Sequence, residues 1–377
     1  MNVLDVHYHS SQFITFSNEL MATRVGVSIT AAMISVQFLE VGLNTLVKSA
    51  NTNGMSNYVF ILYSNLLALF FLLPSTFFFY RNAPPPPPIP TSVLSRILLL
   101  SCLSTTVQTL MYTGIGYSSP TLASAMVDLI PAFTFIIAIF SRMENLNMKR
   151  HSSYAKIIGT VVSIAGALIV TLYKGMPITL SGTSGSLPNK IGTNYLSAEA
   201  NSNWILGGFL LATASFCLSI LFVVQTWIIK DYPEEFVVTT TACGFVVVLS
   251  AIVALFAEHN KKAWILKPDM ELVSIFYSAI FVVSIRSVVT TWACRKKGPV
   301  YVAMFNPLAM VVAIAMGITF LGDTLYLGSV IGAVAIAIGF YSVMWAMAQE
   351  ENMVVKNNEF VPSSTAPLLP KKNTDCT

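Results

Sequence analysis

Three ionisable residues lie inside strongly apolar stretches of this 377-residue sequence: Glu40, Asp128 and Arg286. A charged side chain at the centre of a bilayer costs on the order of 3 kcal/mol on insertion scales. Such groups persist where they pair with one another, face water, or hold a solute or a proton. For Arg286 three arrangements are open: a side chain that reaches for the membrane surface, an ion pair with Asp128 or Glu40, and a site for an anionic solute.

Uncharged polar residues share helical faces with some of these ionisable residues. Gln37, Glu40 and Asn44 are spaced i, i+3, i+7, which is one face of a helix. In lipid such a face must turn toward a neighbouring helix or a wet cavity. Interhelical hydrogen bonding explains any single hydroxyl, whereas the charge of Glu40 needs a partner or water. The candidate solute-binding or coupling residues are Gln37, Glu40, Asn44, Gln108, Tyr112, Asp128, Gln225, Arg286 and Asn306.

Two of these candidates belong to a duplicated pattern. The segment Ala125–Asp128, followed by Pro131, reappears as Ala303–Asn306, followed by Pro307. A proline inside a helix removes a backbone hydrogen bond and kinks or breaks the helix. Proline-interrupted spans at matching places in two halves are a sequence signature of a transporter's binding site. The simpler alternative is a kink capped by a carboxyl or carboxamide group.

A second pair of matching positions consists of glycines. Gly159 and Gly166 reappear as Gly332 and Gly339, again seven residues apart. Seven residues are close to two helical turns, so each pair lies on one face. Small residues there let neighbouring backbones approach closely, which predicts a packing role.

Composition indicates the elements that position all these residues. The chain is 55% hydrophobic and 10% charged, with mean hydropathy +0.70, whereas soluble domains carry about 25% charge. We therefore predict an all-α membrane protein. Ten apolar runs are long enough to span a bilayer, near 26–47, 57–79, 94–116, 120–140, 154–173, 204–227, 235–257, 271–293, 300–320 and 325–347.

Lysine and arginine predict the orientation of these spans. Fourteen of these basic residues lie on the side of the membrane predicted to hold both termini, six lie on the other side, and Arg286 is inside a span. The positive-inside rule therefore places both termini in the cytoplasm. This bias accounts for the net charge of +4 without a nucleic-acid partner.

Ten spans divide into two halves of five. Because five is odd, the second half enters the membrane from the opposite side, and the repeats are predicted to be inverted. The predicted organisation is a cytoplasmic tail (1–25), a first repeat (26–173), an extracytoplasmic linker (174–203), a second repeat (204–348) and a disordered cytoplasmic tail (349–377).

Three stretches resemble a known family. Pro120–Phe135, Lys297–Leu308 and Leu325–Ala333 are similar to plant drug/metabolite transporters with EamA domains, the nodulin-21-like or Walls-Are-Thin-1-related (UMAMIT) group. The resemblance implies ten helices in two EamA repeats. It also implies facilitated or proton-linked movement of amino acids, auxin or related metabolites across the plasma or vacuolar membrane. The family often has asparagine at the position of Asp128 and no base at that of Arg286, so a relative's substrate does not transfer directly.

These observations predict a secondary transporter of small metabolites, amino acids or auxin-like organic acids, working as an exporter or bidirectional facilitator by alternating access. The alternative is a channel-like or sensing protein on the same scaffold. An enzyme is not expected, because all four histidines lie outside the spans and no metal cluster is evident. The expected partners are a small solute, protons as a candidate co-substrate and the lipid bilayer, with no cofactor, no metal and no nucleic acid. The plasma membrane is favoured over the vacuolar membrane, and the oligomeric state stays open.

Overall fold

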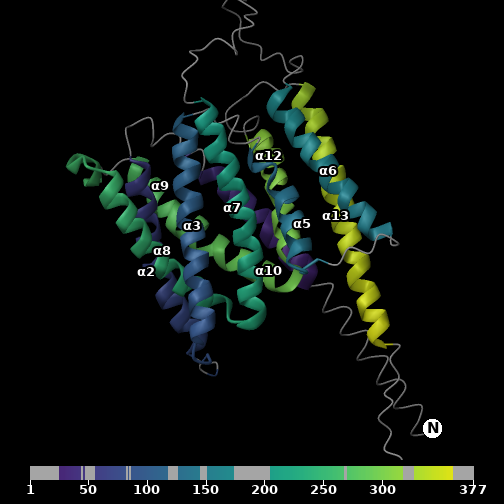
Figure 1. The fold of residues 1–377 in the computed structure, drawn as a ribbon, viewed down its shortest axis with the longest axis horizontal. Coiled ribbons are helices and arrows are strands. Elements are labelled where there is room, and N and C mark those ends of the chain that lie inside the picture. The colour runs from purple at the N-terminus through teal and green to yellow at the C-terminus, as the bar shows by residue number, and fades with distance from the viewer. Residues whose placement is uncertain are drawn as a thin grey trace, which may run out of the picture.

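The computed structural model describes residues 25–43, 46, 56–81, 84, 86–117, 126–144, 151–173, 204–266, 270–316 and 327–359, and this part of the chain is helical (Figure 1). The helices are Val25–Leu43, α2 (Asn57–Tyr80), α3 (Thr91–Tyr117), α5 (Ile130–Phe140), α6 (His151–Leu172), α7 (Trp204–Asp231), α8 (Glu235–Ala257), the 3-10 turn η1 (Lys261–Trp264), α9 (Met270–Tyr277), the π-helix η2 (Ser278–Arg286), α10 (Ser287–Lys297), α11 (Pro299–Ala303), α12 (Phe305–Met316) and α13 (Leu327–Glu359).

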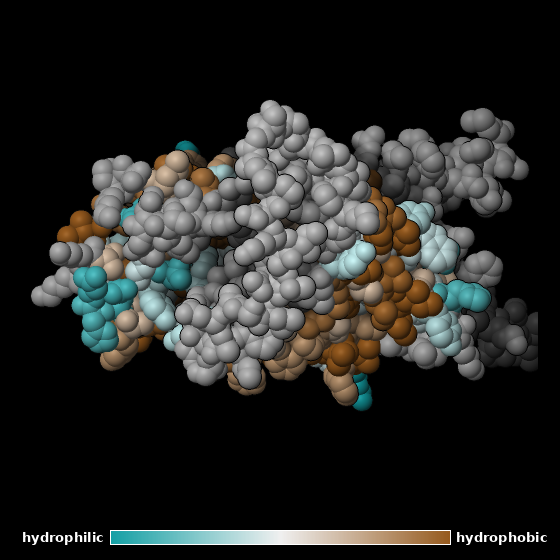
Figure 2. Space-filling model, turned by 90° about the horizontal axis from the view of Figure 1, so that it is seen from above, coloured by the Kyte–Doolittle hydropathy of each residue, from teal (hydrophilic) through white to brown (hydrophobic). Residues whose placement is uncertain are grey.

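The apolar length of these helices fits a membrane protein. Within the described residues, nine helical stretches are long and apolar enough to cross a bilayer, and Ile130–Phe140 is a shorter apolar helix. Large apolar side chains cover the outside of the bundle: Phe140, for example, is 83% exposed. Figure 2, seen from above, shows hydrophobic residues around the edge of the molecule. The prediction of an all-α, multi-pass membrane protein is confirmed.

The last helices of the two halves, α6 and α13, pack through the duplicated glycines (Figure 1). A Cβ atom on Gly159 would lie 2.8 Å from the Gly339 carbonyl oxygen, and one on Gly166 would lie 2.8 Å from the Gly332 carbonyl oxygen. The lower-numbered glycine of one helix thus faces the higher-numbered glycine of the other, so the helices run antiparallel. The predicted packing role of these glycines is confirmed.

The contacts between the first and fourth spans of the two halves are reciprocal. The first helix of the first half contacts the fourth span of the second half, since the hydroxyls of Thr30 and Tyr301 lie 2.9 Å apart. The first helix of the second half, α7, contacts the fourth span of the first half, where the Ser219 hydroxyl donates to the Ile130 carbonyl. A two-fold axis produces such exchanged pairs. Because equivalent helices run antiparallel, this axis is perpendicular to them, which agrees with the predicted inversion.

Helices α2 and α8 are a second equivalent pair, and they too run antiparallel. At one end Ser56 donates to Glu258, and at the other Tyr80 donates to Glu234. Between them the hydroxyls of Thr76 and Thr240 lie 2.7 Å apart. These side-chain bonds tie the two halves together along the full length of the pair.

The Glu258 end of this contact gives a pH-dependent prediction. The Ser56 hydroxyl, and secondly the Asn260 N–H, hydrogen-bond the carboxylate and hold the pKa of Glu258 below its ordinary value. A lowered folded-state pKa adds stability that is complete above the ordinary carboxyl value, about 4.3, and is lost as the pH falls through the lowered value. We expect a small drop in the melting temperature of the purified protein below about pH 4. Glu258→Gln should lose this component of the drop; an identical acid profile would contradict the assignment.

Two of the predicted spans are not uninterrupted α-helices. The span expected at 271–293 is not a uniform α-helix, because the nine-residue π-helix η2 lies between α9 and α10. In the span expected at 120–140, Asp128 and Leu129 form a turn, and α5 covers only 11 residues from Ile130. Residues 118–125 lie outside the described part of the chain.

The tail from 349 onward was predicted to be disordered, which is wrong for its first part. Helix α13 continues to Glu359, and its extension begins with the good helix formers Gln349, Glu350 and Glu351. Lys156, which is buried on α6, pairs with Glu350 and with Glu144, and this fixes the extension to the bundle. Residues 360–377, the 174–203 linker and residues 1–24 lie outside the described residues.

Candidate functional site

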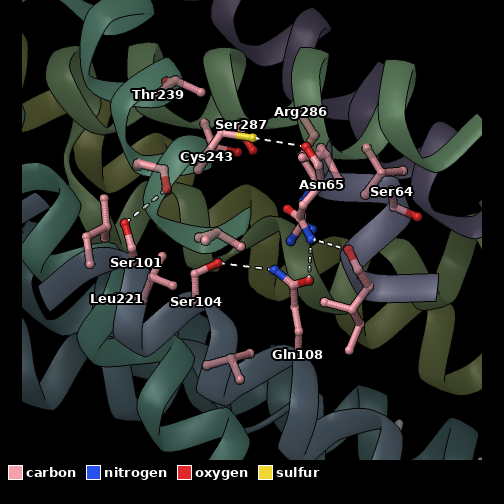
Figure 3. Close-up of a pocket in the computed structure, with 18 of the residues that line it drawn as sticks. Ser64, Asn65, Ser101, Ser104, Gln108, Leu221, Thr239, Cys243, Arg286 and Ser287 are labelled. Atoms are coloured by element: carbon pink, nitrogen blue, oxygen red, sulfur yellow. Dashed lines mark hydrogen bonds between the residues drawn. The ribbon is translucent and has the colours of Figure 1, made fainter. Parts of the chain in front are cut away.

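A cavity of about 330 Å³ lies between the two halves (Figure 3). Its walls come from Val25–Leu43, α2 and α3 of the first half and from α7, α8, η2 and α10 of the second. Pockets for small molecules measure roughly 300–1,000 Å³, so this cavity suits one small solute. Both halves therefore contribute helices to the cavity wall.

The cavity contains an ion pair. Arg286 Nε lies 3.4 Å from Glu40 Oε2, and the two side chains are 28% and 27% exposed. Of the arrangements considered for Arg286, the structure shows pairing with Glu40. Two opposite charges that face each other and a cavity avoid much of the penalty of burial in lipid. The pair therefore places fixed charge of both signs against the interior space.

The π-helix positions one member of this pair. Arg286 is the last residue of η2, and Ser278, Val282 and Val283 of the same segment also line the cavity. A π segment widens the helix and changes which side chains share a face, and such segments are frequent at functional sites. The α-helical spacing expected for this span therefore does not predict which of its residues reach the cavity.

A chain of amide and hydroxyl groups forms another part of the wall (Figure 3). Asn65 Nδ2 donates to the Ile61 carbonyl oxygen at 2.7 Å and to Gln108 Oε1 at 3.2 Å. Gln108 Nε2 in turn donates to Ser104 Oγ at 3.2 Å. This series of hydrogen bonds connects α2 with α3.

Polar side chains of the second half form a separate cluster. Gln225 Nε2 donates to Thr291 Oγ1 at 2.6 Å, and the hydroxyls of Thr239 and Thr291 lie 3.2 Å apart. Between the polar groups the walls are apolar and aromatic; Phe60 and Tyr112 meet edge to face with ring centroids 6.1 Å apart. The cavity thus combines charge, amides and an apolar surface, the composition expected of a small-molecule site.

The structure brings five of the nine candidate residues together: Glu40, Gln108, Tyr112, Gln225 and Arg286 line this cavity. Gln37, Asp128 and Asn306 are not among its lining residues. Asn44 lies outside the described residues. Sequence reasoning missed Asn65, Thr239 and Thr291, although a polar residue within the apolar run of each span was available as a signal.

Asp128 lies instead at the break before α5. It is 2% exposed, and its Oδ2 has no hydrogen-bond partner among the described residues. Its counterpart Asn306 lies at the start of α12, where Nδ2 donates to the Ala303 carbonyl oxygen at 3.0 Å. Pro131 and Pro307 each occupy the first turn after the break in their half. The predicted proline breaks are present in both halves.

We expect Asp128→Asn to preserve the melting temperature and to change transport by less than about twofold, because the second half uses asparagine at the equivalent break. Asp128→Leu, which has no polar group for the break, should lower the melting temperature. The measurement is thermal unfolding together with flux in vesicles. A pH dependence that disappears in Asp128→Asn alone would assign a coupling proton to Asp128 instead.

The architecture consists of two repeats related by an approximate two-fold axis perpendicular to their helices, with a polar cavity between them, a design that recurs among membrane transporters. Residues 27–172 and 205–345 match the EamA-like transporter family. The chain belongs to this family, one copy of the domain in each half.

Plant proteins are among the relatives of this chain. Two WAT1-related proteins of Arabidopsis thaliana are 47% and 42% identical, over 87% and 90% of this chain and 88% and 91% of their own length. A solved crystal structure that is 13% identical covers 85% of this chain and 99% of its own, with a TM-score of 0.62. At that identity the likeness shows the fold alone. The predicted family is confirmed, and the chain is a multi-pass membrane protein of a transporter family.

Proposed function

We propose that this protein is a secondary carrier of small metabolites, either amino acids or auxin-like organic acids, that works as an exporter or bidirectional facilitator by alternating access. The observation that supports this most is the Arg286–Glu40 ion pair in a cavity between the repeats. A carboxylate is the group that an arginine fork binds best. A solute carboxylate would compete with Glu40 for Arg286.

This competition also suggests how protons enter the cycle. When a solute carboxylate occupies Arg286, Glu40 loses its counter-charge, and a proton carried with the solute would restore the charge balance of the cavity. Glu40 is therefore a better coupling candidate than Asp128, which does not line the cavity. The amides of Gln108 and Gln225 would orient the solute, and Tyr112 would pack against its apolar part.

The proline breaks support the proposal that one repeat moves against the other during transport. Each half has a break in its fourth span, before Pro131 or Pro307, and the two are equivalent by the repeat symmetry. Helices interrupted at such places absorb changes of backbone angle when one repeat rocks against the other. With 14 positive residues on the side of the termini, we place both termini in the cytoplasm. The plasma membrane is the proposed location, with tails at 1–25 and from 360 and an extracytoplasmic linker at 174–203.

The test is uptake and efflux of labelled amino acids and indole-3-acetic acid in vesicles reconstituted with the purified protein, over a range of pH. We expect saturable flux of one of these solute classes, and Glu40→Gln should change its pH dependence. Flux that stays linear with concentration would instead favour a channel, and binding with no flux would favour a sensing protein. If Glu40→Gln leaves both rate and pH dependence untouched, the coupling role is wrong.

A further inference from the structure

Asn65 is a cavity residue that its place in the apolar run of α2 did not predict. It is 3% exposed and lines the cavity together with Arg286 and Gln108 (Figure 3). Its side chain does not bond to any residue of the second half among the described residues; its hydrogen bonds go to Ile61 and Gln108. Its orientation can therefore be worked out from these two partners.

The Ile61 carbonyl fixes which end of the Asn65 amide faces which way. A backbone carbonyl only accepts hydrogen bonds, so the group 2.7 Å from it must be Nδ2. The second hydrogen of Nδ2 goes to Gln108 Oε1. Gln108 is then oriented as well, since its Nε2 donates to Ser104. Both hydrogens of Asn65 Nδ2 are used. The Ile61 carbonyl thus sets the direction of each hydrogen bond from Asn65 through Gln108 to Ser104.

This leaves Asn65 Oδ1 as an acceptor without a donor from the described residues. In the absence of a solute, water can donate to it. A solute that displaces this water without replacing the hydrogen bond leaves a buried polar atom unpaired. Sites built to hydrogen-bond one solute group discriminate strongly against analogues that lack it.

We propose that Asn65 is a specificity-determining residue that admits carboxylates carrying an N–H donor, an ammonium or a ring N–H, and rejects carboxylates that lack one. Arg286 receives the carboxylate and Asn65 Oδ1 accepts from the donor. The proposal rests on the proposed function, because it assigns selectivity to the same cavity. It adds a requirement that neither the charges nor the cavity volume impose.

Gln225 provides a matched contrast within the same cavity. The Thr291 hydroxyl donates its one hydrogen to the Ser287 carbonyl at 2.7 Å, so it accepts from Gln225 Nε2. The second hydrogen of Nε2 has no acceptor among the described residues, so Gln225, unlike Asn65, can offer a solute a donor as well as its Oε1. Gln225 is therefore expected to tolerate solutes with and without an N–H donor.

The experiment uses pairs of solutes that differ in the donor. One pair is indole-3-acetate and 1-methylindole-3-acetate, and the other is leucine and 4-methylpentanoate. Competition against a transported label in vesicles with the full-length protein gives an affinity ratio for each pair. We expect the wild-type protein to prefer the donor-bearing member of the transported pair by about tenfold or more.

Asn65→Leu should reduce this ratio to about one. Gln225→Leu, the same change of an amide into leucine, should weaken both members of the pair and keep the ratio. Gln108→Leu is a second variant if Asn65→Leu does not fold. It removes the acceptor of one Asn65 Nδ2 hydrogen, so Asn65 can also donate to a solute and the affinity ratio should fall. An unchanged ratio in the folded Asn65 or Gln108 variant, or a wild-type ratio near one, overturns the role of Asn65. Wild-type vesicles that transport none of the four solutes overturn the proposed function together with this inference.

Discussion

Arg286→Gln is expected to reduce transport to background and to destabilise the protein. The variant leaves the Glu40 carboxylate without its partner at 3.4 Å. Breaking a fully buried pair costs about 3–5 kcal/mol; because both side chains keep more than a quarter of their surface exposed, we expect on the order of 2 kcal/mol. Transport should fall because, among the described residues that line the cavity, Arg286 is the one cation. Thermal unfolding and vesicle flux measure the two effects.

The double variant Glu40→Gln/Arg286→Gln separates structure from function. Two neutral amides remove the uncompensated charge, so the melting temperature should return most of the way to that of the wild type. Transport should stay at background, since the carboxylate-binding cation is still missing. A double variant that recovers both stability and flux would show that the pair is structural only.

Gly339→Ala is expected to prevent close packing of α6 against α13. The added Cβ would lie 2.5 Å from the Gly159 carbonyl oxygen and 2.5 Å from the Ser163 backbone nitrogen. Backbone atoms cannot turn aside as a flexible side chain can, so the helices must separate. Overpacking of this kind costs about 1–3 kcal/mol and sometimes more. We expect a lower melting temperature and a smaller monodisperse fraction in size-exclusion chromatography.

Gly244→Ala is the matched control, because a Cβ at this position of α8 meets nothing within 4 Å. Replacing glycine by alanine inside a helix gains about 0.5–1 kcal/mol where there is room. The control should therefore be as stable as the wild type or slightly more stable. Equal stability for the two alanine variants would contradict the close crossing at Gly339.

Charge and repetition in the sequence predicted the parts of the site that are costly in lipid. Glu40 and Arg286 stand out because each is a charge in an apolar run, and the structure pairs them. The glycines stand out because they repeat at fixed spacing, and they face one another across α6 and α13. Both features depend on residue type and on position along the chain, which a sequence displays directly.

The rest depended on geometry that a periodic pattern does not contain. Helical spacing grouped Gln37 with Glu40, but only Glu40 lines the cavity. The π-helix before Arg286 changes the spacing that such patterns assume. Asn65 lies in an apolar run with no charge to mark it, and its importance comes from the Ile61 carbonyl one turn earlier. Whether such a residue reaches the cavity depends on its hydrogen-bond partners and on the local helix geometry, and both are properties of the folded chain.

Exchange across the vesicle membrane tests the central claim, that one cavity between two inverted repeats serves both sides in turn. Vesicles are loaded with unlabelled solute, and the entry of the labelled solute is followed with and without that load. A carrier with one alternating site predicts saturable entry that is accelerated by solute on the opposite side, and that is absent in Glu40→Gln/Arg286→Gln. Entry that does not saturate and does not respond to the internal solute would contradict the account.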